Sequence, residues 1–210
     1  LDLAHGQYTP ESISDLNDWF VRAETYGWNR LLGMGHRLMG QMRRWAGEHS
    51  ASNTSYQRAL AWAEGAEEIV EVSLCVYGLG VNARAVGDYE RAIQLLQRVI
   101  DNEAAHPELP LNLFARSAMA ACHMGLGHYD LAKQSFQDAG VTAEQLGYQN
   151  LVADALMGQG EIEKLEGKHT QARAFYERAQ STVSILSYAR RAIIELNLCT
   201  LLMAEQQWTT

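Results

Sequence analysis

A short phrase that recurs every 40 residues constrains the fold of this chain more than any other feature. It consists of a glycine, an aromatic-type residue two positions later and an alanine three positions after that, and it aligns without gaps at Gly87–Ala92, Gly127–Ala132 and Gly167–Ala172. After the last of its aromatic-type residues, His169, Trp208 follows at a distance of 39 residues. An internal period of this length indicates stacked supersecondary units rather than one closed globule.

Each phrase lies between two helical patterns. Apolar residues recur at helical spacing from Ser73 to Val86, and the same spacing returns from Tyr89 to about Ile100. Gly87 can take the left-handed backbone that ends a helix, and Asp88 can cap the helix that follows. The phrase therefore predicts the turn of a helical hairpin.

Small residues at fixed positions predict how these hairpins pack. An alanine lies three residues after each aromatic-type residue, and a small residue lies nine before it: Gly80, Ala120, Gly160 and, before Trp208, Cys199. A large side chain at either position would hold the crossing helices apart. The spacing predicts two points of close helix approach in every hairpin.

This pattern resembles the tetratricopeptide repeat, in its longer variety of about 40 residues. The resemblance is good over residues 67–210, whereas residues 1–66 carry irregular versions of the repeat. It implies an all-α, right-handed superhelical solenoid of helix-turn-helix units that forms a single domain over residues 1–210. The segment Ala143–Gly147 is similar to the arrays of bacterial regulatory ATPases of the maltose-activator (STAND) type, and long repeats of this kind also occur in signalling scaffolds.

The first third of the chain departs from the pattern. Residues Trp28 to Trp45 form an amphipathic stretch whose apolar members include Leu31, Leu38, Met42 and Trp45. We expect an extended polar turn from Gly47 to Ser55, followed by a second helix. Because the pattern opens inside a hairpin and stops at Trp208, where a second helix should begin, we expect a fragment of a longer protein.

Composition narrows the possible partners. The chain has 17 basic and 25 acidic residues, a formal charge of −8, which argues against direct binding of nucleic acid. We interpret the densest basic cluster, Arg37, Arg43 and Arg44, as the wet face of one helix. No apolar run approaches the about 20 residues that cross a bilayer, so we expect no membrane insertion. The cysteines, Cys75, Cys122 and Cys199, lack metal or redox spacing, and we expect them to be reduced and buried in a cytoplasmic protein.

No motif in the sequence points to catalysis. Two Glu-x-x-His spacings, Glu103–His106 and Glu166–His169, straddle turns between helices, where the ligands of a metal need not converge. Glycine pairs such as Gly78/Gly80 and Gly158/Gly160 lie inside helical periods rather than after strands, which favours close helix packing over phosphate binding. We therefore expect a chain that is not an enzyme and needs neither cofactor nor metal.

The resemblance also places a binding surface, because the first helices of such hairpins line the concave face of the array. By register this face carries Leu74, Tyr77, Val81, Arg84, Phe114, Ser117, Ala121, Met124, Asp154, Met157, Glu161, Lys164, Ile193, Leu196, Thr200 and Met203. The set is largely apolar, which suits an amphipathic helix or an apolar segment of a partner protein. It lacks the lysine, asparagine and arginine clamp with which chaperone-binding arrays hold a terminal carboxylate.

Alternatives to this interpretation stay open. The first is a protein-binding or peptide-binding scaffold within a larger cytoplasmic signalling or regulatory protein, with Tyr77, Met157 and Leu196 facing solvent. The second is an effector-sensing domain of a bacterial transcriptional regulator or STAND ATPase, which would enclose a small molecule in a pocket with converging polar groups such as Arg84 and Glu161. In the third, the apolar residues of the first helices simply contact one another.

Overall fold

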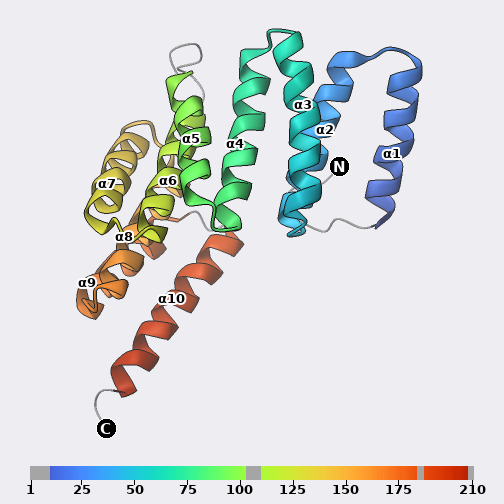
Figure 1. The fold of residues 1–210 in the computed structure, drawn as a ribbon. Helices are drawn as coiled ribbons and strands as arrows, with labels where there is room; N and C mark the ends of the chain where they lie inside the picture. The colour runs from blue at the N-terminus through green and yellow to red at the C-terminus, as the bar shows by residue number, and fades with distance from the viewer. Residues whose placement is uncertain (1–9, 103–109, 184–186, 208–210) are drawn as a thin grey trace. The chain divides into compact units, whose positions relative to one another are not determined.

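The computed structural model describes residues 10–102, 110–183 and 187–207, with side chains from Asp18 to Met203 within these ranges (Figure 1). All regular structure in the described ranges is α-helical. The chain divides into two compact units, Leu1–Leu111 and Asn112–Thr210. None of the helices in the described ranges has the length and apolar character needed to cross a bilayer.

The first unit is a succession of helices, each packed against the next. They are α1 (Pro10–Thr25), α2 (Asn29–Trp45), α3 (His49–Gly65), α4 (Ile69–Ala85) and α5 (Tyr89–Asp101). Helix α2 also contacts α4. The α2–α3 and α4–α5 hairpins therefore stack so that their first helices touch.

The second unit repeats this arrangement. Its helices are α6 (Leu111–Gly125), α7 (Tyr129–Gln145), α8 (Gln149–Leu165), α9 (His169–Thr182) and α10 (Tyr188–Gln207). Helices α6, α7 and α8 share a core of Ala120, Ala132, Phe136 and Ile162. A second core joins α8, α9 and α10 around the fully buried ring of Tyr176. Both units thus have the hairpin stacking that the sequence period predicts.

Three-residue turns join α1 to α2, α2 to α3, α3 to α4 and α4 to α5 in the first unit, and α6 to α7, α7 to α8 and α8 to α9 in the second; the middle residue of each has left-handed backbone. Six glycines occupy this place with φ between 67° and 82°: Gly27, Gly47, Gly87, Gly127, Gly147 and Gly167. At the α4–α5 turn the Gly87 N–H donates to the Arg84 carbonyl at 3.1 Å and the Asp88 N–H donates to the Ala83 carbonyl at 2.9 Å. This is the paired hydrogen-bond pattern that closes a helix C-terminus when the next residue is left-handed.

Two expected helix boundaries are wrong. The extended polar turn expected from Gly47 to Ser55 does not form, because α3 begins at His49. Its polar N-terminal half is used in packing: the Ser52 hydroxyl is fully buried and donates to the Gly40 carbonyl of α2 at 2.7 Å. Helix α4 begins at Ile69, one turn before the expected Ser73.

The predicted points of close approach are confirmed around Tyr89, Tyr129 and His169, whereas Cys199 is exposed and the prediction at that position is wrong. Ala92, Ala132 and Ala172 are fully buried. A β-carbon added to Gly160 would lie 2.8 Å from the Tyr176 ring. The glycine pairs also serve packing, since Gly78 lies against Tyr56 and Gly158 against Phe136.

The cysteines only partly meet expectation. Cys75 and Cys122 are buried, and burial raises the pKa of the Cys75 thiol to about 12, which keeps it protonated and unreactive. Cys199 is exposed, so its predicted burial is wrong. Helix α10 packs against α9 through a face that carries Ile194 and Leu201, and Cys199 lies on another side of the helix.

Candidate functional site

In the first unit, part of the binding surface expected on the first helices is buried. Leu74, Tyr77 and Arg84 of α4 are half-buried, but Val81 is only 8% exposed. The expected role of Val81 in lining an open groove is therefore wrong, because its side chain is used in packing. Leu74, Tyr77 and Arg84 keep part of their surface available.

In the second unit, several expected groove residues support the core. Phe114 packs against the cluster of Leu113, Ala143 and Leu151. Met124 packs against the core that contains Phe136, and Met157 packs against the core around Tyr176. Ser117 is half-buried. Much of the predicted surface on α6 and α8 is therefore used in packing within the unit, as in the alternative in which the apolar residues of the first helices contact one another.

The polar residues of the α8 face are engaged within the unit. Asp154 accepts two hydrogen bonds from the Arg190 guanidinium of α10, at 2.8 and 2.9 Å. Glu161 accepts a hydrogen bond from the Tyr176 hydroxyl at 2.9 Å and pairs with Lys164 at 2.6 Å. Burial raises the pKa of Tyr176, and Glu161 raises it further, so the phenol stays protonated and donates. Asp154 thus links α8 to α10, and Glu161 links α8 to α9.

Helix α10 carries the most accessible part of the predicted face. Ile193 is 50% exposed, and Leu196 and Met203 are each 63% exposed. Leu196 faces solvent as the groove hypothesis predicts, whereas Tyr77 and Met157 are only half-exposed. A row of large apolar side chains in water is unusual on a single surface helix unless a partner covers it.

The structure adds a second exposed apolar row that the sequence analysis missed. Leu31, Leu38 and Trp45 of α2 are 45%, 37% and 50% exposed. Their expected place on the buried side of an amphipathic helix is wrong, because α2 buries Gly33, Gly35, Met39, Gly40 and Met42 instead. The ring of Trp62 lies over Gly33 and that of Tyr56 over Gly40. Glycines on one side of α2 were the signal in the sequence that could have identified its packed face.

The arginines of α2 are not a wet face, and that interpretation is wrong. Arg37 pairs with Glu71 of α4 at 2.7 Å, with both side chains largely buried. Arg43 donates to the Ser55 hydroxyl at 2.9 Å and to the Ala51 carbonyl at 3.3 Å. These contacts join α2 to α4 and α3.

Two further half-buried arginines have no carboxylate within ion-pair distance among the described residues. Arg44 of α2 and Arg84 of α4 occupy the same position in successive first helices, 40 residues apart, and each has a buried Nε without a hydrogen-bond partner. The Arg44 guanidinium lies 5.7 Å from the ring centroid of Trp45. Burial raises the pKa of Tyr56, and a hydrogen bond from the Arg44 side chain partly offsets this effect, so Arg44 has a neutral partner in a tyrosine that packs on α4.

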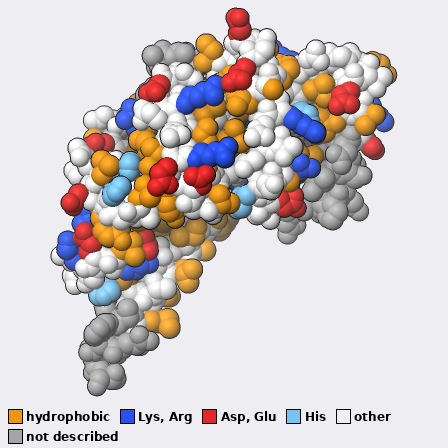
Figure 2. Space-filling view, in the orientation of Figure 1, with side chains coloured by type: hydrophobic (Ala, Val, Ile, Leu, Met, Phe, Trp, Pro, Cys, Tyr) orange, Lys and Arg blue, Asp and Glu red, His pale blue; other side chains and the backbone are white. Residues whose placement is uncertain are grey.

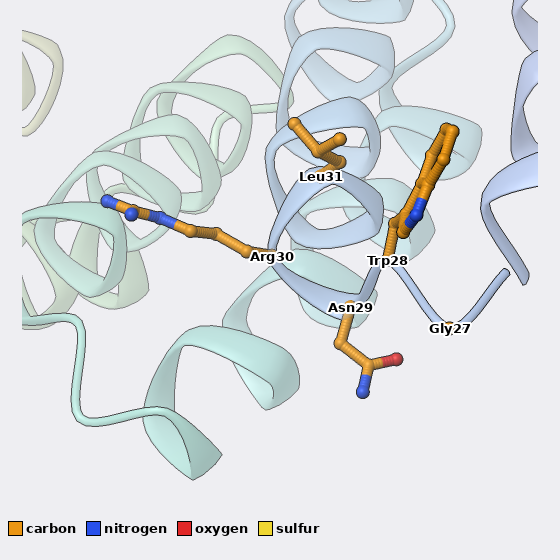
Figure 3. A pocket seen from close by; sticks show the side chains of 5 residues that line it. All are labelled: Gly27, Trp28, Asn29, Arg30 and Leu31. Atoms are coloured by element: carbon orange, nitrogen blue, oxygen red, sulfur yellow. The ribbon is translucent and has the colours of Figure 1, made fainter.

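The residues that the sequence predicts to converge in a sensor pocket are divided between the two compact units. Arg84 belongs to the first unit and Glu161 to the second. A depression of about 470 Å³ is lined by Gly27, Trp28, Asn29, Arg30 and Leu31, but it is open, and the Asn29 and Arg30 side chains point in different directions (Figure 3). A small-molecule site needs converging polar groups, which this depression lacks.

Among the described residues, no group of three or more histidine, cysteine, aspartate or glutamate side chains is placed to hold a metal ion. Glu166 is paired with Lys133 at 2.6 Å and with Lys168 at 2.8 Å. These amines lower the pKa of the Glu166 carboxyl, with Lys133 the larger cause. The other spacing, Glu103–His106, lies outside the described residues.

Comparison with known proteins supports the same fold. The profile described as "Tetratricopeptide repeat" matches residues 75–104. No curated protein matches the sequence. The crystal structure of BtubC (BKLC) from P. vanneervenii is similar with a TM-score of 0.74 and 14% identity, over 96% of this chain and 87% of that one. The apo form of RapI is similar with a TM-score of 0.71 and 16% identity, over 81% of this chain and 62% of that one. The chain thus carries a match to one tetratricopeptide repeat at residues 75–104 and has an all-α, tetratricopeptide-like fold of sequentially packed helix-turn-helix units.

Proposed function

We propose that this protein is a non-catalytic scaffold that binds a partner protein or peptide through the first helices of its hairpins, within a larger cytoplasmic signalling or regulatory protein. One observation carries the proposal: large apolar side chains stay exposed along first helices. In α10 they are Ile193, Leu196 and Met203. Contiguous apolar surface of this kind marks sites of macromolecular interaction.

The architecture supports recognition by side chains rather than by backbone. All regular structure in the described ranges is helical and offers no sheet edge there for backbone pairing, so a partner gains affinity by burying apolar side chains against the exposed row. Methionine adapts its shape to different partners, and Met203 lies at the end of the α10 row. An amphipathic helix that lays its apolar side on α10 matches this surface.

An effector-sensing function has less support. It requires polar groups that converge around a small molecule, but Glu161 is engaged by Tyr176 and Lys164 inside its own unit. Asp154 is likewise engaged by Arg190. The polar groups of α8 thus serve packing, and the exposed surface suits a larger and more apolar ligand.

The test is binding of a fluorescein-labelled amphipathic helical peptide with a leucine stripe to the full chain, measured by fluorescence anisotropy. We expect Leu196→Ser and Tyr77→Ala to weaken binding while circular dichroism stays unchanged, because both substitutions remove apolar contact area from helices that pack through other residues. Leu131→Ser is the matched control, since Leu131 is 47% exposed on α7, a second helix. Equal binding by all variants, or no binding of the peptide at all, would overturn the proposal.

A further inference from the structure

Helix α2 combines two parallel rows of side chains with opposite character. Leu31, Leu38 and Trp45 recur every seven residues and are exposed. An arginine precedes each of them directly, giving a second row of Arg30, Arg37 and Arg44. A seven-residue spacing keeps each row on one side of a helix, because it closely matches two helical turns.

Ion pairs place the arginine row at the α4 side of α2. Arg30 lies 3.4 Å from Glu68 at the start of α4, and Arg37 lies 2.7 Å from Glu71. Arg44, the third member, has no carboxylate within ion-pair distance among the described residues, and neither has Arg84 at the equivalent position of α4. Since packed helices lie about 8–10 Å apart, one bound segment can reach both guanidinium groups.

The charge of the α2–α3 hairpin is the reverse of that of the whole chain. Residues 29–65 carry five arginines and two glutamates, a net charge of +3, although the chain as a whole carries −8. A half-buried guanidinium without a carboxylate is unfavourable, because a neutral partner such as the Tyr56 hydroxyl beside Arg44 does not balance its charge. An acidic ligand would provide the missing partner.

We propose that this arginine-apolar surface, formed by Leu31, Leu38 and Trp45 with Arg44 and Arg84, binds an acidic amphipathic helix of a partner protein. The inference rests on the proposed binding function and specifies the chemistry of one ligand. The apolar row from Leu31 to Trp45 extends about 21 Å along the helix axis, which a partner helix of about four turns covers. Apolar side chains of that helix bury Leu38 and Trp45, and carboxylates on its flank reach Arg44 and Arg84.

The residues at the equivalent position of the first helices in the second unit differ from Arg44 and Arg84. Lys164 occupies the place of Arg84 in α8, and it is already paired with Glu161 at 2.6 Å. Met124 occupies the same place in α6 and carries no charge. Arginines without a carboxylate partner among the described residues therefore distinguish the α2–α4 surface from its counterpart in the other unit.

The experiment uses the full chain and three labelled helical peptides of about 18 residues, long enough to span the row. They share one leucine stripe and carry Glu, Gln or Lys beside it. We expect the Glu peptide to bind at least about threefold more tightly than the Gln peptide at low salt, with the difference shrinking as KCl rises. The double variant Arg44→Gln/Arg84→Gln should remove the difference, and Leu38→Ala should weaken binding of both the Glu and the Gln peptides. The matched controls Arg91→Gln and Leu131→Ala, at exposed positions on second helices, should change neither.

The other possible results of these binding experiments each reject a different part of the proposal. Equal binding of the Glu and Gln peptides rejects the acidic ligand but leaves the proposed function standing. Failure of all three peptides to bind rejects the proposed function itself. Tighter binding of a single-stranded oligonucleotide than of the Glu peptide, lost in the double arginine variant, assigns the surface to nucleic acid. Self-association that Leu38→Ala abolishes, seen by analytical ultracentrifugation, assigns it to a second copy of this chain.

Discussion

Tyr56 of α3 and Gly78 of α4 pack so closely that a β-carbon built on Gly78 would lie 2.3 Å from Cζ of the tyrosine ring. The relationship recurs 80 residues later, where Gly158 lies against Phe136 at 2.4 Å. In both cases an aromatic ring of a second helix fills the space above a glycine in the first helix of the next hairpin. The contact therefore sets how closely consecutive hairpins stack.

We expect Gly78→Ala to destabilise the protein by about 1–3 kcal/mol, because the new methyl group must displace a ring that is held on its other side by Gly40. Urea unfolding measures the change. Gly65→Ala is the control: no atom lies within 4 Å of its added β-carbon, and the lower entropy of the unfolded chain should stabilise the protein by about 0.4–1 kcal/mol. Equal effects of the two substitutions would contradict the packing role of Gly78.

Glu67 stands where six other turns have glycine, and it takes the same left-handed backbone with φ of 57°. A side chain in this conformation costs about 1–2 kcal/mol relative to right-handed backbone, which glycine avoids. Glu67→Gly should therefore raise the free energy of unfolding by about 1 kcal/mol, as measured by thermal and urea denaturation. Gly87→Ala, at the next turn, should lower it. A destabilised Glu67→Gly variant would show that the glutamate side chain makes a compensating contact.

The hairpins could be predicted from the sequence because their signals are local. The turn at Gly87 and the small residue at Ala92 lie within six residues of each other, and both describe the same crossing of helices. The buried side of helix α2 was harder to predict, because apolar residues lie on two sides of the helix. Leu31, Leu38 and Trp45 have the larger side chains, yet glycines form the buried side, where the partner helix supplies the bulk.

The binding surface could be predicted only in part, since exposure depends on residues far away in the sequence. Register placed Met157 on the first-helix face, but it packs against a core built from α8, α9 and α10. Likewise, no spacing rule links Asp154 with Arg190, 36 residues later. The exposure of Leu196 was easier to predict, because it follows from the packed side of its own helix, which Ile194 and Leu201 define.

The bidentate pair of Asp154 and Arg190 should contribute measurably to the attachment of α10. Both side chains keep a quarter to a third of their surface in water, so solvent screening limits the coupling energy to about 0.5–1 kcal/mol. A double-mutant cycle with Asp154→Asn and Arg190→Gln, followed by urea unfolding, measures this coupling. Arg190→Lys should lose most of it, because an amine cannot make the paired contact. A coupling energy of zero would mean that apolar contacts of Ile194 and Leu201 alone hold the helix.

Acid should destabilise the protein through two histidines, one in each unit. Burial lowers the pKa of His123, and His128, whose ring centroid lies 6.1 Å away, lowers it further. Burial also lowers the pKa of His36, with Arg58 as the second cause. Because the unfolded chain then binds more protons than the folded one, the stability from these groups is present above the ordinary pKa of 6.5 and is lost as the pH falls through the folded values.

The measurement is the melting temperature of wild type and of His36→Gln/His123→Gln at pH 7.5 and pH 5.5. We expect the melting temperature of wild type to fall more between pH 7.5 and pH 5.5 than that of the double variant, because glutamine does not titrate. Arg91→Gln, a charge change at an exposed residue of α5, is the control and should keep the wild-type pH dependence. If the melting temperatures of the double variant and of wild type fall by the same amount, the acid sensitivity does not arise from the two buried imidazoles.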